Sequence, residues 1–230
     1  MRIVLWDVDG TLLLNGGRAG RLYDEAIRAV TGVEPGGERQ GEHGKTDAQI
    51  ITERLRASDL DPALLPAVAT KLDELSEAGN TGPWARRTAP GVDAALDAVA
   101  AAGWTNGILT GNSPARVRYK FAGAGLDPGR FDWRHSYFGD RALTRAAITT
   151  AARADLGPGT LAVILGDTPS DAAAADVAGF PFLAVATGVY GEEELAGTSA
   201  VVVVPDLERG LTAVLEALGR LAHAPTSASR

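Results

Sequence analysis

The amino-acid sequence predicts an α/β fold in which an all-helical segment is inserted into a doubly wound parallel sheet. From residue 88 onward, strand-like and helix-like apolar patterns alternate along the chain, which is typical of a parallel sheet covered by helices on both faces. The segments 161–165 and 200–204 are almost continuously apolar, as expected of strands that are buried on both faces. Between the first strand and residue 88 the patterns are helical, which indicates an insertion.

The first strand is expected at residues 3–6, and the insertion after it is expected to contain three amphipathic helices. Their apolar residues recur at the spacing of a helix face. Thr46 is the expected N-cap of the second helix, and Gln49 three residues later makes a weak capping box. The helices are expected at 19–31, 46–57 and 62–78.

The rest of the chain alternates between the two kinds of element. Helices are expected at 91–102, 113–124, 144–154, 169–178, 192–196 and 207–221. Strands are expected at 104–110, 161–165, 182–186 and 200–204, with a weaker one at 135–138.

This order divides the chain into two domains and a tail. The α/β core is expected to comprise residues 1–14 and 88–222, and the helical insertion residues 15–87. The polar segment 223–230 is expected to be a disordered tail. An inserted domain beside a reactive centre is well placed to act as a lid. Arg86 and Arg87, at the return to the core, could guide an anion, but we interpret them as a hinge surface.

Composition and charge narrow the classes of function. The 230 residues are 45% hydrophobic and 22% charged, which is ordinary for a soluble globular protein. The net charge of −7 argues against a nucleic-acid or membrane partner, since either would favour a basic face. The absence of cysteine excludes disulfides, thiolate metal sites and cysteine nucleophiles. No signal peptide or membrane span is expected, so we predict a cytoplasmic enzyme. We expect it to be a monomer or a homodimer.

The strongest functional signal is the pair of carboxylates Asp7 and Asp9 at the end of the first strand, followed by Gly10 and Thr11. Residues two apart along a strand point to the same side of the sheet, so both carboxylates are expected to face one small volume. Like charges this close need a cation, a shared proton or a shifted pKa. The pair therefore predicts a functional site.

Polar residues also follow two other predicted strands. Thr110-Gly111-Asn112 follows strand 104–110, and its hydroxyl, its glycine and the helix N-terminus after it suit a phosphate group. Asp167 and Asp171 follow strand 161–165, and Arg145 lies near the start of helix 144–154. Because ligands of open α/β sheets bind at the carboxyl ends of the strands, we expect these groups to converge. Four carboxylates favour a hard divalent ion, above all Mg²⁺.

With these motifs in order, the chain resembles the haloacid dehalogenase-like hydrolase superfamily, and within it the phosphoglycolate phosphatase-like members. These combine a Rossmann-like core with a helical cap inserted after the first motif. Motifs I, II and IV match Asp7–Thr11, Thr110–Asn112 and Gly166–Asp171. Motif III is the weakest match, because the family more often has a lysine in a Lys-Pro-x-Pro context. Arg145 occupies its position and Lys120 is the rival candidate.

The resemblance implies a Mg²⁺-dependent phosphatase that acts on a small phosphorylated metabolite, such as 2-phosphoglycolate or a sugar phosphate. Asp7 would attack phosphorus and form an aspartyl-phosphate, and Asp9 would protonate the leaving oxygen and then activate water. Mg²⁺ would bind Asp7, the carbonyl of Asp9 and Asp167, with Asp171 in or next to its coordination sphere.

Phosphate binding is implied for the loops around these carboxylates. Thr110 would hold a phosphoryl oxygen and Arg145 would balance charge between Asp7 and the phosphoryl group. Lys45, in the insertion, precedes a helix and is a candidate for the other end of the substrate, although Thr46 and Asp47 beside it also make an ordinary helix start. The remaining candidates for phosphate binding are Gly10, Thr11, Gly111 and Asn112.

Two alternative functions stay open. A phosphosugar mutase of the β-phosphoglucomutase type has the same motifs and cap, and differs in passing the phosphoryl group to a sugar hydroxyl. A non-catalytic phosphate- or metal-binding module, resembling a response-regulator receiver, is less favoured because it has no use for the insertion or for Asp9. Dehalogenation is disfavoured as well, since family members that cleave carbon–halogen bonds lack an aspartate at the position of Asp9.

Overall fold

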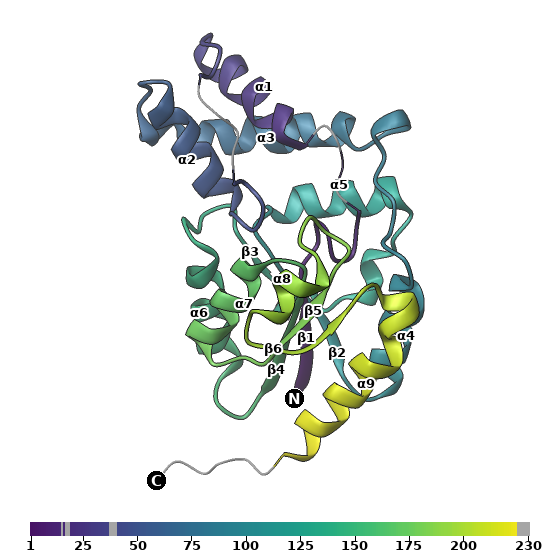
Figure 1. Cartoon of the computed structure of the whole chain (residues 1–230). Coiled ribbons are helices and arrows are strands. Elements are labelled where there is room, and N and C mark those ends of the chain that lie inside the picture. The colour runs from purple at the N-terminus through teal and green to yellow at the C-terminus, as the bar shows by residue number, and fades with distance from the viewer. Residues whose placement is uncertain (15, 17–18, 37–40, 225–230) are drawn as a thin grey trace.

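The computed structural model describes residues 1–14, 16, 19–36 and 41–224. The described residues form one six-stranded sheet in which every pair of neighbouring strands is parallel, in the order β3-β2-β1-β4-β5-β6 (Figure 1). This is the order of a doubly wound sheet, whose direction of winding reverses beside β1. The predicted fold class is confirmed. The strands are β1 (Arg2–Trp6), β2 (Thr105–Thr110), β3 (Tyr137–Phe138), β4 (Leu161–Gly166), β5 (Phe182–Val185) and β6 (Ala200–Val204).

Helices cover both faces of this sheet, which explains why β1 is apolar throughout its buried length. Val4 and Trp6 point to one face and share a core with α4 (Val92–Ala101), α5 (Pro114–Ala124) and α9 (Leu207–His223). Ile3 and Leu5 point to the other face, where the core is completed by α6 (Arg145–Leu156), α7 (Pro169–Ala178) and α8 (Glu192–Ala196). Alternate residues of a strand thus anchor two separate helix layers.

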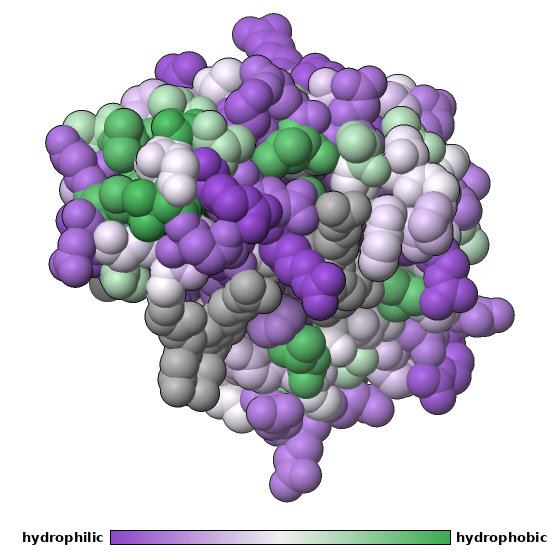
Figure 2. Space-filling view, turned by 90° about the horizontal axis from the view of Figure 1, so that it is seen from above, coloured by the Kyte–Doolittle hydropathy of each residue, from purple (hydrophilic) through white to green (hydrophobic). Residues whose placement is uncertain are grey.

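The helical insertion lies over the carboxyl ends of the strands, next to α5 (Figure 1). It consists of α1 (Ala19–Thr31), α2 (Asp47–Ala57) and α3 (Leu65–Gly79), with short 3₁₀ turns at Pro62–Leu64 and Gly82–Trp84. Its helices pack around a core of their own, in which Ile27, Ile51, Leu55 and Leu72 are almost fully buried. Hydrophilic side chains cover most of the face seen from this end (Figure 2).

The chain enters and leaves the insertion along two segments that lie side by side. Leu14 N donates to Arg87 O at 2.9 Å, and Ala89 N donates to Leu12 O at 3.0 Å. The expected boundaries of the insertion fall at this paired stretch. The division into a core of 1–14 and 88–222 and an inserted domain of 15–87 stays a prediction.

Several predicted elements differ at their ends from those of the structure. Helix 62–78 begins as a 3₁₀ turn, because Pro66 has no N–H to complete the α-helical bond to Pro62 O. The weak strand 135–138 is reduced to β3, since Asp132 caps a 3₁₀ turn over Trp133–His135. Thr46 caps α2 as expected.

At the carboxyl terminus α9 runs two residues beyond its predicted end, to His223. The remainder of the predicted tail, 225–230, lies outside the described residues. None of the helices in the described part of the chain is both long enough and apolar enough to cross a lipid bilayer.

Candidate active site

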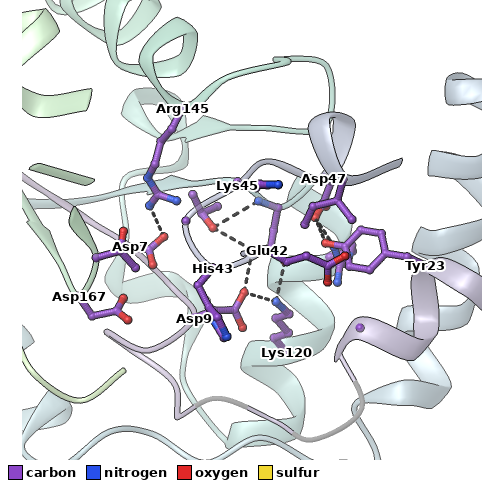
Figure 3. Close-up of a pocket in the computed structure, with 18 of the residues that line it drawn as sticks. Asp7, Asp9, Tyr23, Glu42, His43, Lys45, Asp47, Lys120, Arg145 and Asp167 are labelled. Carbon is purple, nitrogen blue, oxygen red and sulfur yellow. Dashed lines mark hydrogen bonds and ion pairs between the residues drawn. The ribbon is translucent and has the colours of Figure 1, made fainter. Parts of the chain in front are cut away.

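A cavity of about 230 Å³ lies between the carboxyl edge of the sheet and the insertion (Figure 3). The strand ends line one side of it and the loop before α2 lines the other. The sequence-predicted residues that line this cavity are Asp7, Asp9, Lys45, Thr110, Gly111, Asn112, Arg145 and Asp167. The predicted convergence of separate strand ends is therefore observed.

The carboxylates of Asp7, Asp167 and Asp171, which we call the carboxylate cluster, form the buried floor of the site. One oxygen of each lies within 4.8 Å of the others, and each residue is at most 4% exposed. Asp7 directly follows β1 and Asp167 follows β4, while Asp171 lies in the first turn of α7. Because β1 and β4 are neighbours in the sheet, their carboxyl ends bring Asp7 and Asp167 together.

Arg145 joins two members of this cluster. Its Nη2 lies 2.5 Å from Asp7 Oδ1, and its Nε lies 2.5 Å from Asp171 Oδ1. A guanidinium presents several donors in a fixed plane, which allows one side chain to hold two carboxylates. Arg145 itself is 6% exposed.

Small residues let the backbone come close to Asp167. Gly10 has a φ of +91°, and a Cβ there would lie 2.1 Å from Asp167 Oδ2. A Cβ on Gly188 would lie 1.7 Å from the same oxygen. Thr11 Oγ1 donates to Asp167 Oδ1 at 2.9 Å, so the observed contact of this hydroxyl is with the carboxylate cluster, and phosphate contact by Gly10 and Thr11 stays a prediction.

The carboxylate cluster carries more negative charge than its surroundings neutralise. Burial raises the pKa of Asp7 to about 6, with the charge of Arg145 opposing this shift and that of Asp171 adding to it. Burial and the charges of Asp7 and Asp171 raise the pKa of Asp167 well above its ordinary value. Among the described residues a single guanidinium, that of Arg145, contacts this cluster, and it reaches two of the three carboxylates. Oxygen ligands in this arrangement fit a divalent ion such as Mg²⁺, which would relieve the repulsion.

Asp9 has different neighbours, although it also lines the cavity. Lys120 Nζ and Asn112 Nδ2 both donate to Asp9 Oδ2, the latter at 2.9 Å, and Arg86 Nη2 lies 3.6 Å from Asp9 Oδ1. Burial would raise the pKa of Asp9, but the charges of Lys120 and Arg86 outweigh it and hold that pKa below the usual range. Burial lowers the pKa of Lys120 to about 8 against the opposing charge of Asp9.

The loop after β2 lies between these two regions. Thr110 is fully buried, and Asn112 Nδ2 donates to its Oγ1 at 3.0 Å. A Cβ on Gly111 would lie 2.3 Å from Lys45 O, so glycine allows the loop of the insertion to pack against the strand end. Asp47 N donates to Gly111 O at 2.7 Å. Gly111 therefore lets the insertion close over the cavity in this structure.

Lys45 lines the cavity from the insertion side, as do Glu42 and His43. Its ammonium lies 2.7 Å from Glu53 Oε2 on α2. Contact between Lys45 and a substrate stays a prediction.

Sequence reasoning missed a buried polar network between the insertion and the core, formed by Tyr23, Asp47, Ser113 and Arg116. We call it the interface network. Arg116 contacts Asp47 Oδ1 and donates to Tyr23 Oη at 2.9 Å, while Ser113 N donates to Asp47 Oδ2 at 3.0 Å. The sequence contains only a weak indication of this network. Arg116 lies four residues before Lys120, so the two side chains lie on the same face of α5 and Arg116 could have been expected near the site.

The second feature not predicted is that Arg86 and Lys120 both lie beside Asp9. Arg86 is 7% exposed, so its interpretation as hinge surface is wrong: the side chain turns inward, beside Gly16, where a Cβ would lie 2.4 Å from Arg86 Nη1. Of the two candidates for motif III, Arg145 contacts Asp7 and Lys120 contacts Asp9. Both therefore line the cavity, each paired with a different aspartate.

Several solved structures have a fold similar to that of this chain. CbbY from Rhodobacter sphaeroides, in complex with phosphate, is 22% identical with a TM-score of 0.66, over 90% of this chain and 95% of that chain. A predicted phosphatase from Clostridium acetobutylicum is 16% identical with a TM-score of 0.69, over 94% and 98%. A putative β-phosphoglucomutase from Thermotoga maritima is 18% identical with a TM-score of 0.56, over 94% and 99%.

At these identities the three structures establish the fold alone, and a search of curated proteins returned no match. The sequence pattern of the haloacid dehalogenase-like hydrolases matches residues 1–179. That stretch contains the carboxylate cluster, Asp9, the loop after β2 and Arg145. The chain belongs to the haloacid dehalogenase-like hydrolases.

Proposed function

We propose that this protein is a Mg²⁺-dependent phosphatase that hydrolyses a small phosphorylated metabolite through an aspartyl-phosphate on Asp7. The observation that carries the proposal is the setting of Asp7. It is buried in the carboxylate cluster, is held by Arg145, and lines the same cavity as Asp9 and Thr110. A carboxylate nucleophile needs this combination of a fixed orientation and nearby positive charge to approach a phosphate anion.

In the proposed reaction, an oxygen of Asp7 attacks phosphorus and the bond from phosphorus to the leaving oxygen breaks. Asp9, protonated in the substrate complex, gives a proton to that oxygen, and then takes one from the water that attacks the aspartyl-phosphate and releases inorganic phosphate. The lowered pKa of Asp9 belongs to the protein without bound phosphate. Arg145 keeps Asp7 in place, and the Thr110 hydroxyl holds a phosphoryl oxygen. Mg²⁺, held by Asp7, Asp167, Asp171 and the carbonyl of Asp9, would supply positive charge between carboxylate and phosphate.

The size and lining of the cavity support a small polar substrate of the phosphoglycolate or sugar-phosphate type. Its volume is about 230 Å³, and its insertion side offers charged side chains such as Glu42 and Lys45. A phosphoglycolate phosphatase-like subgroup, a cytoplasmic location and a monomeric or homodimeric state remain parts of this proposal. The absence of nucleic-acid and membrane partners is likewise proposed from the net charge of −7.

The test is phosphate release from a panel of phosphorylated metabolites, measured with Mg²⁺ and with EDTA. We expect release with Mg²⁺, loss of release with EDTA, and loss in Asp7→Asn. Asp176→Asn is the matched control, since it makes the same chemical change on an exposed turn of α7. Full activity of Asp7→Asn would contradict the covalent mechanism.

A phosphosugar mutase is the second candidate, favoured by the packing of the insertion on Gly111 over the cavity. A closed site limits the access of water, and this would suit transfer to a sugar hydroxyl. Conversion of a sugar phosphate to its isomer without free phosphate would identify a mutase. Binding of Mg²⁺ and phosphate without either reaction would indicate a non-catalytic module.

A further inference from the structure

We propose that Lys120 is a positioning residue which, together with Asn112, holds Asp9 Oδ2 and thereby fixes the carboxylate of Asp9 in the orientation that proton exchange with the leaving group requires. This inference rests on the proposed phosphatase function. It concerns a residue on the helix after motif II, and it separates the task of Lys120 from that of Arg145.

Lys120 closes a ring of three polar side chains. Its ammonium contacts Asp9 Oδ2 and lies 2.6 Å from Asn112 Oδ1, while Asn112 Nδ2 lies 2.9 Å from the same Asp9 oxygen. Each pair in the ring is in hydrogen-bond contact, so rotation of any one side chain would break two contacts. The ring therefore fixes the plane of the Asp9 carboxylate.

The two oxygens of Asp9 are left in different situations. Oδ2 accepts from both Lys120 and Asn112. Oδ1 is buried and has no hydrogen-bond partner among the described residues, and the Arg86 Nη2 lies 3.6 Å away, beyond hydrogen-bond distance. The hydrogen bonds of the Asp9 carboxylate among the described residues are thus made through Oδ2, so its orientation depends on Lys120 and Asn112.

Arg145 does not hold Asp9 in place of Lys120, because its guanidinium contacts Asp7 and Asp171. Figure 3 shows the two cations at opposite sides of the cavity, Arg145 pointing toward Asp7 and Lys120 toward Asp9. Lys120 is 2% exposed, and a buried ammonium is costly unless it is paired. Its position on α5 is thus explained by its contacts with Asp9 and Asn112.

The test compares two phosphomonoesters that differ in the need for a proton on the leaving oxygen: an alkyl phosphate and p-nitrophenyl phosphate. General acid catalysis contributes about 10²- to 10⁴-fold where a proton is needed. We therefore expect Lys120→Met to lower kcat/KM for the alkyl ester at least about 10²-fold, and for the nitrophenyl ester less than about 10-fold. Equal losses for both esters would overturn the proposal.

Two further measurements keep the result interpretable. Arg118→Met removes an exposed cation from the same helix and should leave the ratio of the two kcat/KM values unchanged. Asp9→Asn should show the same selective loss, and adding Lys120→Met to it should cost little more, because the partner has already been changed. If Lys120→Met alone fails to fold because it leaves the Asp9 carboxylate unpaired, the double variant can still be measured, since the asparagine that replaces Asp9 carries no charge. A large additional loss would contradict the positioning role.

The wild-type protein separates this proposal from the proposed function. If it releases phosphate from neither ester, the phosphatase proposal fails and the role of Lys120 falls with it. If it hydrolyses both, and Lys120→Met loses both equally, the phosphatase stands and the positioning role alone is wrong.

Discussion

The carboxylate cluster and the interface network are both buried and both built from charged side chains, yet their charges are balanced differently. In the interface network, Arg116 and the Tyr23 hydroxyl both contact Asp47 Oδ1, and the backbone N–H of Ser113 donates to Asp47 Oδ2. In the carboxylate cluster, Arg145 faces the carboxylates of Asp7 and Asp171 with Asp167 alongside. The first arrangement is complete as it stands, whereas the second requires a cation.

This difference distinguishes a structural from a functional use of buried charge. The interface network joins α1 and α2 to the start of α5, and so holds the insertion over the cavity. Paired buried charges give little net stability, but losing one partner is costly. Uncompensated charge, with pKa values displaced from their ordinary range, is typical of sites that bind or react.

The two buried arginines allow the sharpest comparison of these regions, and Arg145→Met should have the largest effect on activity. It removes the group that holds Asp7, so we expect kcat/KM to fall by about 10³-fold. Steady-state kinetics on the best phosphoester of the panel would measure this. Near-normal activity would mean that Arg145 does not act as the motif III cation.

Arg116→Met should instead act on stability. It leaves Asp47 buried without its partner, which is expected to cost about 3–5 kcal/mol in the free energy of unfolding. Urea denaturation would measure the loss, with Arg118→Met as the exposed control. If the cost comes from the unpaired carboxylate, Arg116→Met combined with Asp47→Asn should recover part of it, and no recovery would contradict that cause.

Mg²⁺ should raise the stability of the protein through the carboxylate cluster, because the ion supplies the positive charge that this cluster lacks. At 100 times its Kd, a ligand of the folded state adds about 2.7 kcal/mol to stability, which for a chain of this size raises Tm by roughly 5–10 °C. We expect this rise in the wild type and in Asp176→Asn, and its loss in Asp167→Asn. Thermal melts with and without Mg²⁺ would test it, and an equal rise in Asp167→Asn would place the ion elsewhere.

The smallest effect is the pH dependence of the metal-free protein. Because folding raises the pKa of Asp7 from 3.8 to about 6, the folded state binds more protons than the unfolded state between these values. The stability linked to Asp7 is thus fully present below about pH 4 and is lost as the pH rises through about 6.

The raised pKa of Asp167 also makes stability fall as the pH rises. The pKa of Asp9 is lowered, so Asp9 changes the stability only at pH values below the ordinary pKa of an aspartate. Urea unfolding from pH 4.5 to 7.5 in EDTA should therefore show a steeper loss of stability in the wild type than in Asp7→Asn. Parallel pH profiles would show that Asp7 is not destabilised by its burial.

Much of the fold followed from local patterns. The continuous apolar strands predicted a parallel sheet, and the helical patterns before residue 88 predicted the insertion. Errors occurred where one side chain outweighed the pattern, as with Pro66 at the start of α3 and the cap by Asp132 before β3. The strand ends predicted the cavity lining well, because parallel strands carry their following residues to one edge.

The sequence by itself determined which groups meet at the sheet edge, since Asp7, Thr110 and Asp167 each follow a strand directly and the order of strands places them together. Only the tertiary structure decided how their charges are paired. The chain leaves β1 at Trp6, so strand alternation no longer governs Asp7 and Asp9. Contacts from α5 and α6, more than a hundred residues away, place Lys120 on Asp9 and Arg145 on Asp7. Ion pairs of this separation depend on how the helices pack, which no local spacing encodes.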